Sequence, residues 1–145
     1  MREIYSTAYL AEEQIESAYV LVSAFAPAIT PAEWRIFCLA SLSSNDGSGV
    51  GTVLDPSGYV RAVAVFAPRR DIAGNKWLDV PLFAPLSAAD SRRVARAMIG
   101  FLERVARPSG CAALRFRSLH ADKWHRYIVG DEAADDDGVT MTLSA

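Results

Sequence analysis

The pattern of apolar and polar residues divides the chain into extended and helical segments. Residues 3–9 (EIYSTAY) have the composition of a short strand. Between residues 11 and 25 the apolar side chains recur at helical spacing, and three glutamates lie near the end where the helix dipole favours anions. The pattern predicts a strand followed by a helix whose buried side carries Ile15, Ala18, Tyr19, Val22 and Phe25.

A second helix has clear start signals. Thr30 can cap it, Pro31 suits its first position, and Glu33 completes a capping box. The polar segment 43–49 (SSNDGSG) ends it. Much of its buried stripe is predicted to come from Trp34, Phe37, Cys38 and Leu42.

Three extended runs come next. Residues 49–54 and 59–69 flank Asp55-Pro56-Ser57-Gly58, where proline and glycine stand as a type I turn requires, so a hairpin is predicted. A polar loop leads to the third run, KWLDVPLFAP (76–85). Because Pro81 has no N–H to donate to a ladder, this strand is expected to be bulged or locally unpaired there.

The last third of the chain alternates helix and strand. Residues 88–107 predict an amphipathic helix, with Val94, Met98, Phe101 and Val105 on its buried stripe. A strand at 111–118, a short helix at 120–128 and a closing strand at 138–144 follow. The acidic run 131–138 is expected to be a solvated hairpin turn.

Composition argues against nucleic-acid-binding, membrane-spanning and secreted proteins. With 145 residues, 51% of them hydrophobic, the chain is expected to form a single domain over residues 1–145. A net charge of −2 argues against a nucleic-acid partner. No apolar run reaches the ~18 residues of a membrane span, and no signal peptide is recognised. Cys38 and Cys111 lie in apolar settings outside any CxxC motif, which indicates a reduced, cytoplasmic protein.

No metal site is expected. His120 and His125 are five residues apart, a spacing that directs them away from each other on a helix. The acidic run lacks the ligand spacing of a calcium loop.

The order strand, two helices, three-strand meander, helix, strand, helix, strand resembles the GNAT superfamily of acyl-CoA N-acyltransferases over nearly the whole chain. The closest local match is LFAPLSAADSRRVARAMIGFLERVARPSGCAALRF (82–116). The resemblance implies an α/β (α+β) GNAT-like domain with a mixed, mostly antiparallel sheet, a central parallel pair and about four flanking helices. In this family the fourth strand is bulged and splays from the fifth, and the pantetheine arm of the cofactor enters between them. Pro81 fits that irregularity, and the resemblance assigns Phe83 and Ala84 to the cofactor.

The family's pyrophosphate motif, Q/R-x-x-G-x-G/A, is degenerate in this chain. Asp90 takes the first position and Arg93 replaces the central glycine, whereas Ala95 keeps the final small residue. Two interpretations stay open: the arginines replace part of the backbone cradle with phosphate-binding guanidinium groups, or phosphate binding is lost and they are solvated. The resemblance assigns to the cofactor Ser91, Arg92, Arg93, Val94, Ala95 and Arg96.

The resemblance also suggests candidates for proton transfer. The family's acid is often a tyrosine on the fourth helix, and Tyr127 lies in the matching region with His125 and Arg126 as rivals. The alternatives are a core aromatic for Tyr127 and an exposed helix residue for His125. Asp79, on the bulged strand, is the candidate base, and the alternative is a surface-facing strand residue.

The implied activity is transfer of an acyl group, such as acetyl, from acetyl-CoA or another acyl-CoA to a small-molecule amine, without a metal. The alternative is a catalytically silent GNAT-like module that binds a CoA ligand or another protein. Neither nucleic acid nor membrane is expected as a partner, and whether the chain forms a homodimer is left open. The segment from Asp90 to Ala95 discriminates between the two functions.

Overall fold

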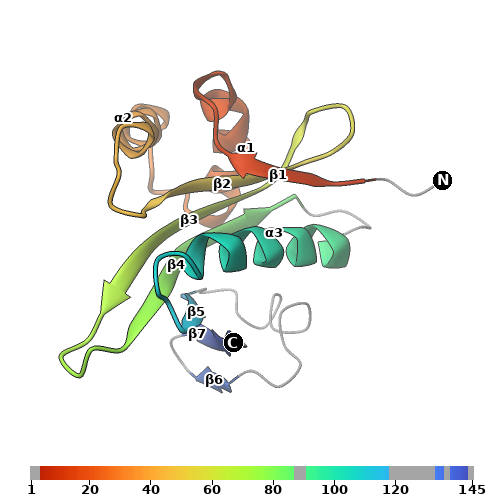
Figure 1. Cartoon of the computed structure of the whole chain (residues 1–145). Helices are drawn as coiled ribbons and strands as arrows, with labels where there is room; N and C mark the ends of the chain where they lie inside the picture. The colour runs from red at the N-terminus through yellow and green to blue at the C-terminus, as the bar shows by residue number, and fades with distance from the viewer. Residues whose placement is uncertain (1–3, 87–90, 118–132, 136–137, 144–145) are drawn as a thin grey trace.

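A seven-stranded mixed sheet forms the centre of the molecule in the computed structural model (Figure 1), which describes residues 4–86, 91–117, 133–135 and 138–143. The strand order is β1-β2-β3-β4-β5-β7-β6; the β4–β5 pair is parallel and the other neighbours are antiparallel. The predicted sheet with its central parallel pair is confirmed. The elements are β1 (Ser6–Tyr9), the 3-10 turn η1 (Glu12–Gln14), α1 (Ile15–Phe25), α2 (Pro31–Leu42), β2 (Gly49–Leu54), β3 (Val60–Arg70), β4 (Lys76–Pro85), α3 (Ser91–Ala106), β5 (Ala113–Phe116), β6 (Ala133–Asp135) and β7 (Gly138–Thr142).

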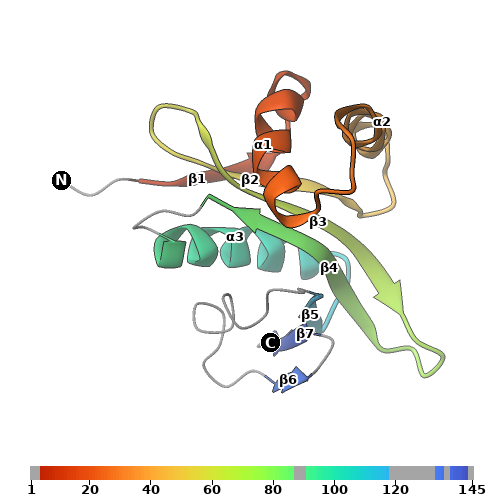
Figure 2. The same ribbon diagram turned by 180° about the vertical axis from the view of Figure 1, so that it is seen from behind.

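Helices cover both faces of the sheet. Helices α1 and α2 lie on one face and α3 lies on the other, as the two opposite views show (Figures 1 and 2). Alternating side chains of the central strands supply two cores, because successive residues of a strand point to opposite faces. On β3, Ala64 and Phe66 pack in the α3 core, whereas Val63 packs in the α1/α2 core.

The start of α2 is formed by the predicted capping box. Oγ1 of Thr30 accepts a hydrogen bond from the Glu33 N–H (3.1 Å), and Oε1 of Glu33 accepts one from the Thr30 N–H (2.9 Å). The predicted buried stripe is partly wrong. Trp34 and Cys38, one turn apart, face the core, but Phe37 is 44% exposed at the edge of that narrow stripe. Leu42 is 47% exposed and lies in the last turn beside a small pocket.

Two predictions concern the end of the chain: the acidic turn at 131–138 and the helix at 120–128. The acidic run, expected to be a solvated turn, also provides β6, which pairs with β7 up to Asp135 and Gly138. This register confirms a hairpin closing at that point. The helix predicted at 120–128 lies outside the described residues.

Candidate functional site

Strand β4 is bulged at the predicted proline. Val65 pairs with Leu82 and Ala67 pairs with Asp79, so two residues of β4, Val80 and Pro81, stand opposite a single residue of β3. An extra residue in one strand bends it and changes which face the following side chains take. The irregularity expected from Pro81 is therefore confirmed.

At this bulge β4 parts from its parallel neighbour. Three pairs join β4 to β5, from Leu78–Leu114 to Val80–Phe116, and the Arg117 N–H donates to the Val80 carbonyl at 3.0 Å. Beyond Val80, within the part of the chain that the structure describes, β4 continues to Pro85 paired with β3 alone. The two central strands thus diverge in the middle of the sheet.

The bulge turns the backbone of Phe83 toward the side that β5 has left. The Leu86 N–H donates to the Arg61 carbonyl of β3 at 2.8 Å. Because backbone groups alternate sides along a strand, Ala84 also faces β3, and Phe83 faces the other way. The two predicted cofactor residues of β4 lie directly after the divergence, with the Phe83 ring packed in the α3 core and Ala84 buried on the α1/α2 side.

The first turns of α3 separate buried small side chains from exposed cations. Ser91 is the first helical residue. Val94 and Ala95 are buried against the sheet, where a small side chain at position 95 lets the helix approach closely. Three arginine side chains in these turns are exposed: Arg92, Arg93 and Arg96.

Asp79 precedes the bulge and is buried, not surface-facing. Its side chain is 2% exposed and lies on the α1/α2 face, since its neighbours Leu78 and Val80 pack in the α3 core. Its Oδ1 lies 2.9 Å from Nε of Arg117 and its Oδ2 lies 3.9 Å from Nε of Arg69. The carboxylate is therefore held between an arginine of β3 and one that directly follows β5, and its role as a base stays a prediction. Tyr127 and His125 lie outside the described residues, so their roles also stay predictions.

A pocket of about 490 Å³ opens beside the bulge, on the α1/α2 face. It lies between the α1–α2 connection, the first turns of α2 and the bulged parts of β3 and β4. Eight of its nine lining residues are apolar, among them Ile29, Trp34, Phe37, Val65, Pro81 and Leu82. Its volume lies within the range of small-molecule sites, roughly 300–1,000 Å³.

Hydrogen bonds fix the walls of this pocket. The Tyr19 hydroxyl donates to the carbonyl of Ile29 in the α1–α2 connection (2.5 Å), and Nε1 of Trp34 donates to the carbonyl of Ile15 (3.0 Å). The ring of Phe37 stacks beside Trp34, with centroids 6.1 Å apart and an interplanar angle of 20°. These contacts hold the walls of the pocket in place.

Glu33 is the ionisable side chain among the described residues that line the pocket. Hydrogen bonds from the backbone and the side chain of Thr30 hold the pKa of its carboxyl below the ordinary value. Glu33 therefore places a fixed negative charge beside apolar walls. Sequence reasoning assigned it to the helix cap alone and missed this position.

The sequence predicts Phe37 in the buried stripe of α2, and for this reason the pocket that Phe37 lines was not expected. Ile36, Phe37 and Leu39 are all apolar, which is more than the sheet-facing stripe of a helix needs. Such an excess is the one sequence signal for an apolar surface beside α2.

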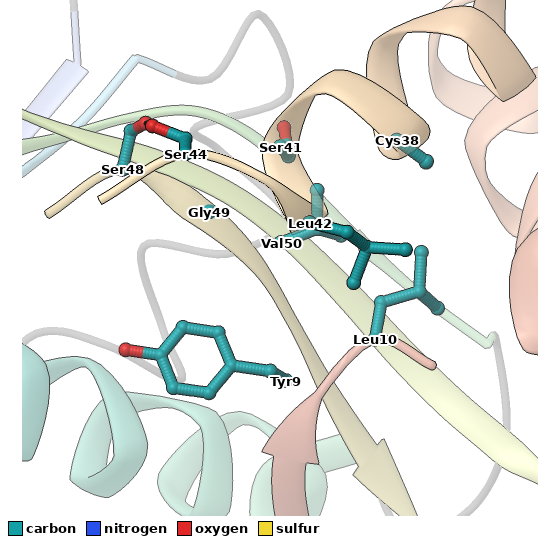
Figure 3. A pocket seen from close by; sticks show the side chains of 9 residues that line it. All are labelled: Tyr9, Leu10, Cys38, Ser41, Leu42, Ser44, Ser48, Gly49 and Val50. Carbon is teal, nitrogen blue, oxygen red and sulfur yellow. The ribbon is translucent and has the colours of Figure 1, made fainter. Parts of the chain in front are cut away.

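A smaller pocket of about 150 Å³ lies between the end of α2 and strands β1 and β2 (Figure 3). Ser44 and Ser48 line it, and both donate to Asp46, which lowers the pKa of that carboxyl to about 2. Burial raises the pKa of the Cys38 thiol to about 12. With a weakly basic carboxylate and a protonated thiol, this pocket offers no activated nucleophile.

In the described residues no three His, Cys, Asp or Glu side chains gather as metal ligands would, and no described helix has the length and apolarity needed to cross a membrane.

Comparisons with known proteins identify the fold. No protein-family model and no curated protein matches the sequence. Among solved structures, the chain is similar to the aminoglycoside N-acetyltransferase AAC(6')-Iy in complex with CoA (TM-score 0.72, 12% identity, 90% of this chain and 91% of that one). It is also similar to glucosamine-6-phosphate N-acetyltransferase from Arabidopsis thaliana (0.67, 11%, 91% and 95%) and to ribosomal-protein-alanine N-acetyltransferase from Brucella melitensis biovar Abortus 2308 (0.66, 15%, 91% and 94%). The chain has the GNAT fold, as the order of its elements predicts.

Proposed function

We propose that this protein is an N-acyltransferase that moves an acyl group from acyl-CoA to an amine. One observation carries the proposal: β4 leaves β5 at Val80, and the next two residues, Pro81 and Leu82, line a mainly apolar pocket. An acyl donor entering between the strands and an acceptor in the pocket would meet at the bulge. Acetyl-CoA is the donor favoured by the fold, since one neighbour with this fold is an acetyltransferase in complex with CoA.

The residues around the divergence fit a CoA ester. The backbone of Phe83 faces the side that β5 has left, so it is oriented to bond the amide-containing arm of the donor. Exposed Arg92, Arg93 and Arg96 lie at the N-terminal end of α3, where backbone N–H groups and guanidinium groups both favour phosphate. Guanidinium groups at this position would offset the missing motif glycine.

The thioester supplies an activated acyl carbon. An acceptor that arrives as an ammonium group first loses one proton to solvent, because only the neutral amine can attack. In the transfer a bond forms between the neutral amine nitrogen and this carbon and the carbon–sulfur bond breaks, so the nitrogen loses a further proton and the sulfur gains one. We assign the donation to Tyr127, with His125 as the alternative, and the acceptance to Asp79. Of the remaining candidates, Ser91 would offer its backbone at the start of α3, and Ala84, Val94 and Ala95 would shape the donor site through close packing.

Calorimetric titration of acetyl-CoA tests the donor site. We expect saturable binding that weakens as salt is raised, and Arg93→Glu should weaken it by about fivefold or more, because it replaces a phosphate-binding cation with an anion. Arg104→Glu reverses a charge near the other end of α3 and is the matched control; it should leave the affinity unchanged.

The outcomes separate the two candidate functions. Acetyl-CoA that fails to bind the wild type would refute the proposal. Binding without acetylation of any amine in a broad panel would leave a ligand-binding module. Equal affinity of wild type and Arg93→Glu would remove the arginines from the donor site.

A further inference from the structure

The pocket beside the bulge has the chemistry of an apolar ligand site with one anionic position. Its walls include Trp34, Phe37, Val65 and Leu82, and Glu33 carries its charge. Burying a hydroxyl or a second charge against such walls costs free energy, because the polar group loses water without gaining a partner. A ligand rich in hydroxyl, phosphate or several ammonium groups therefore fits this pocket poorly.

Glu33 selects the sign of the ligand's charge. Its Oε1 atom accepts the Thr30 N–H, and the side chain is solvent-exposed at the start of α2. Carboxylates and phosphates are repelled by this group, whereas a single ammonium is attracted. The neighbouring ring of Phe37, which is partly exposed, adds an aromatic face on which a cation or an aromatic group can lie.

We infer that the acceptor is a monoamine whose single ammonium group is attached to an aromatic or branched aliphatic body, and that this pocket holds the body. The inference rests on the proposed function, because it names the substrate class for the same site. The hydrogen bonds of Tyr19 and Trp34 that fix the walls reduce the ordering needed on binding.

Direct binding of simple probes tests the inference separately from catalysis. The probes are 2-phenylethylamine, its neutral analogue 2-phenylethanol, spermidine and glucosamine 6-phosphate, each titrated calorimetrically with and without CoA. We expect 2-phenylethylamine to bind at least tenfold more tightly than spermidine or the sugar phosphate. Tighter binding of either polar probe would overturn the inference.

Two variants locate the probe. Phe37→Ala should weaken 2-phenylethylamine about tenfold or more through lost apolar contact, whereas Ile36→Ala, on the same helix but outside the pocket, should not. Glu33→Gln keeps a side-chain oxygen for the Thr30 N–H, so the cap is retained. It should weaken 2-phenylethylamine about two- to fivefold and leave 2-phenylethanol unchanged. Equal effects of Phe37→Ala and Ile36→Ala, or of Glu33→Gln on both probes, would refute the placement.

Measuring acetyl transfer to the same probes shows whether the transferase function or the acceptor class is wrong. If acetyl-CoA is consumed with spermidine or glucosamine 6-phosphate at a higher kcat/KM than with 2-phenylethylamine, the acceptor class is wrong and the transferase stands. If acetyl-CoA does not bind but 2-phenylethylamine binds in a Phe37-dependent manner, the proposed function fails and the pocket assignment stands.

Discussion

At the scale of single residues, Asp79 is the candidate whose role is most open to experiment. It is buried and ion-paired with Arg117, so one side chain combines a structural contact with a chemical assignment. We expect Asp79→Asn to lower kcat for amine acetylation about a hundredfold or more, because the amide cannot accept the proton. We also expect a loss of about 1–3 kcal/mol in the free energy of unfolding, since a buried charged hydrogen bond is lost. Steady-state kinetics and chemical denaturation measure the two effects.

Arg117→Gln is the matched control, because it weakens the same ion pair and leaves the carboxylate in place. Stability should fall in both variants, but turnover should collapse in Asp79→Asn alone. If both variants keep wild-type kcat, Asp79 is a structural residue.

At the scale of elements, Gly138 determines how closely β7 can pack beside β5. A Cβ at this position would lie 1.9 Å from the carbonyl oxygen of Phe116, and the glycine has φ of +150°. Gly138→Ala should therefore lower the free energy of unfolding by about 3 kcal/mol or more, as measured by urea denaturation. Gly74→Ala, at φ of +90° with open space around its Cβ, should cost about 1–2 kcal/mol from backbone strain alone. Equal losses in the two variants would show that β7 can move away from β5.

The elements also show which features the sequence determines. Local signals sufficed for the cap at Thr30 and Glu33, the Asp55–Gly58 turn and the bulge at Pro81, since each depends on the chemistry of a few adjacent residues. The pocket could not be predicted, because it forms where segments distant in the chain meet. Whether Phe37 packs in the core or lines that pocket depends on the tilt of α2 against the sheet, which helical spacing leaves undetermined. The burial of Asp79 likewise depends on its cross-strand arginines.

At the scale of the whole molecule, the divergence of β4 and β5 predicts where the protein responds to its donor. We expect hydrogen exchange to slow at residues 82–86 and 91–95 when CoA is added, because a ligand between the strands covers both segments. The turn at 71–75 joins β3 to β4 at the opposite end of these strands; it should be unaffected and is the internal control. Bound CoA at a hundred times its Kd should also add about 2.7 kcal/mol to stability. Protection elsewhere without protection of 82–86 would contradict the proposed donor site.

The capping box of α2 also bears on how this protein can evolve. Glu33 both accepts the hydrogen bond of the Thr30 N–H and lies beside the pocket. The same residue therefore affects the stability of the helix and the charge of the ligand that the pocket prefers. Replacing the carboxylate with a cation or an apolar group would lose the hydrogen bond to the Thr30 N–H, while Oγ1 of Thr30 would still accept the backbone N–H of residue 33. Drift toward anionic ligands is therefore expected to require a prior stabilising substitution elsewhere, whereas exchange between Glu and Gln is open at any time. Descendants of this sequence should accordingly vary at Phe37 before they replace Glu33 with any residue other than Gln.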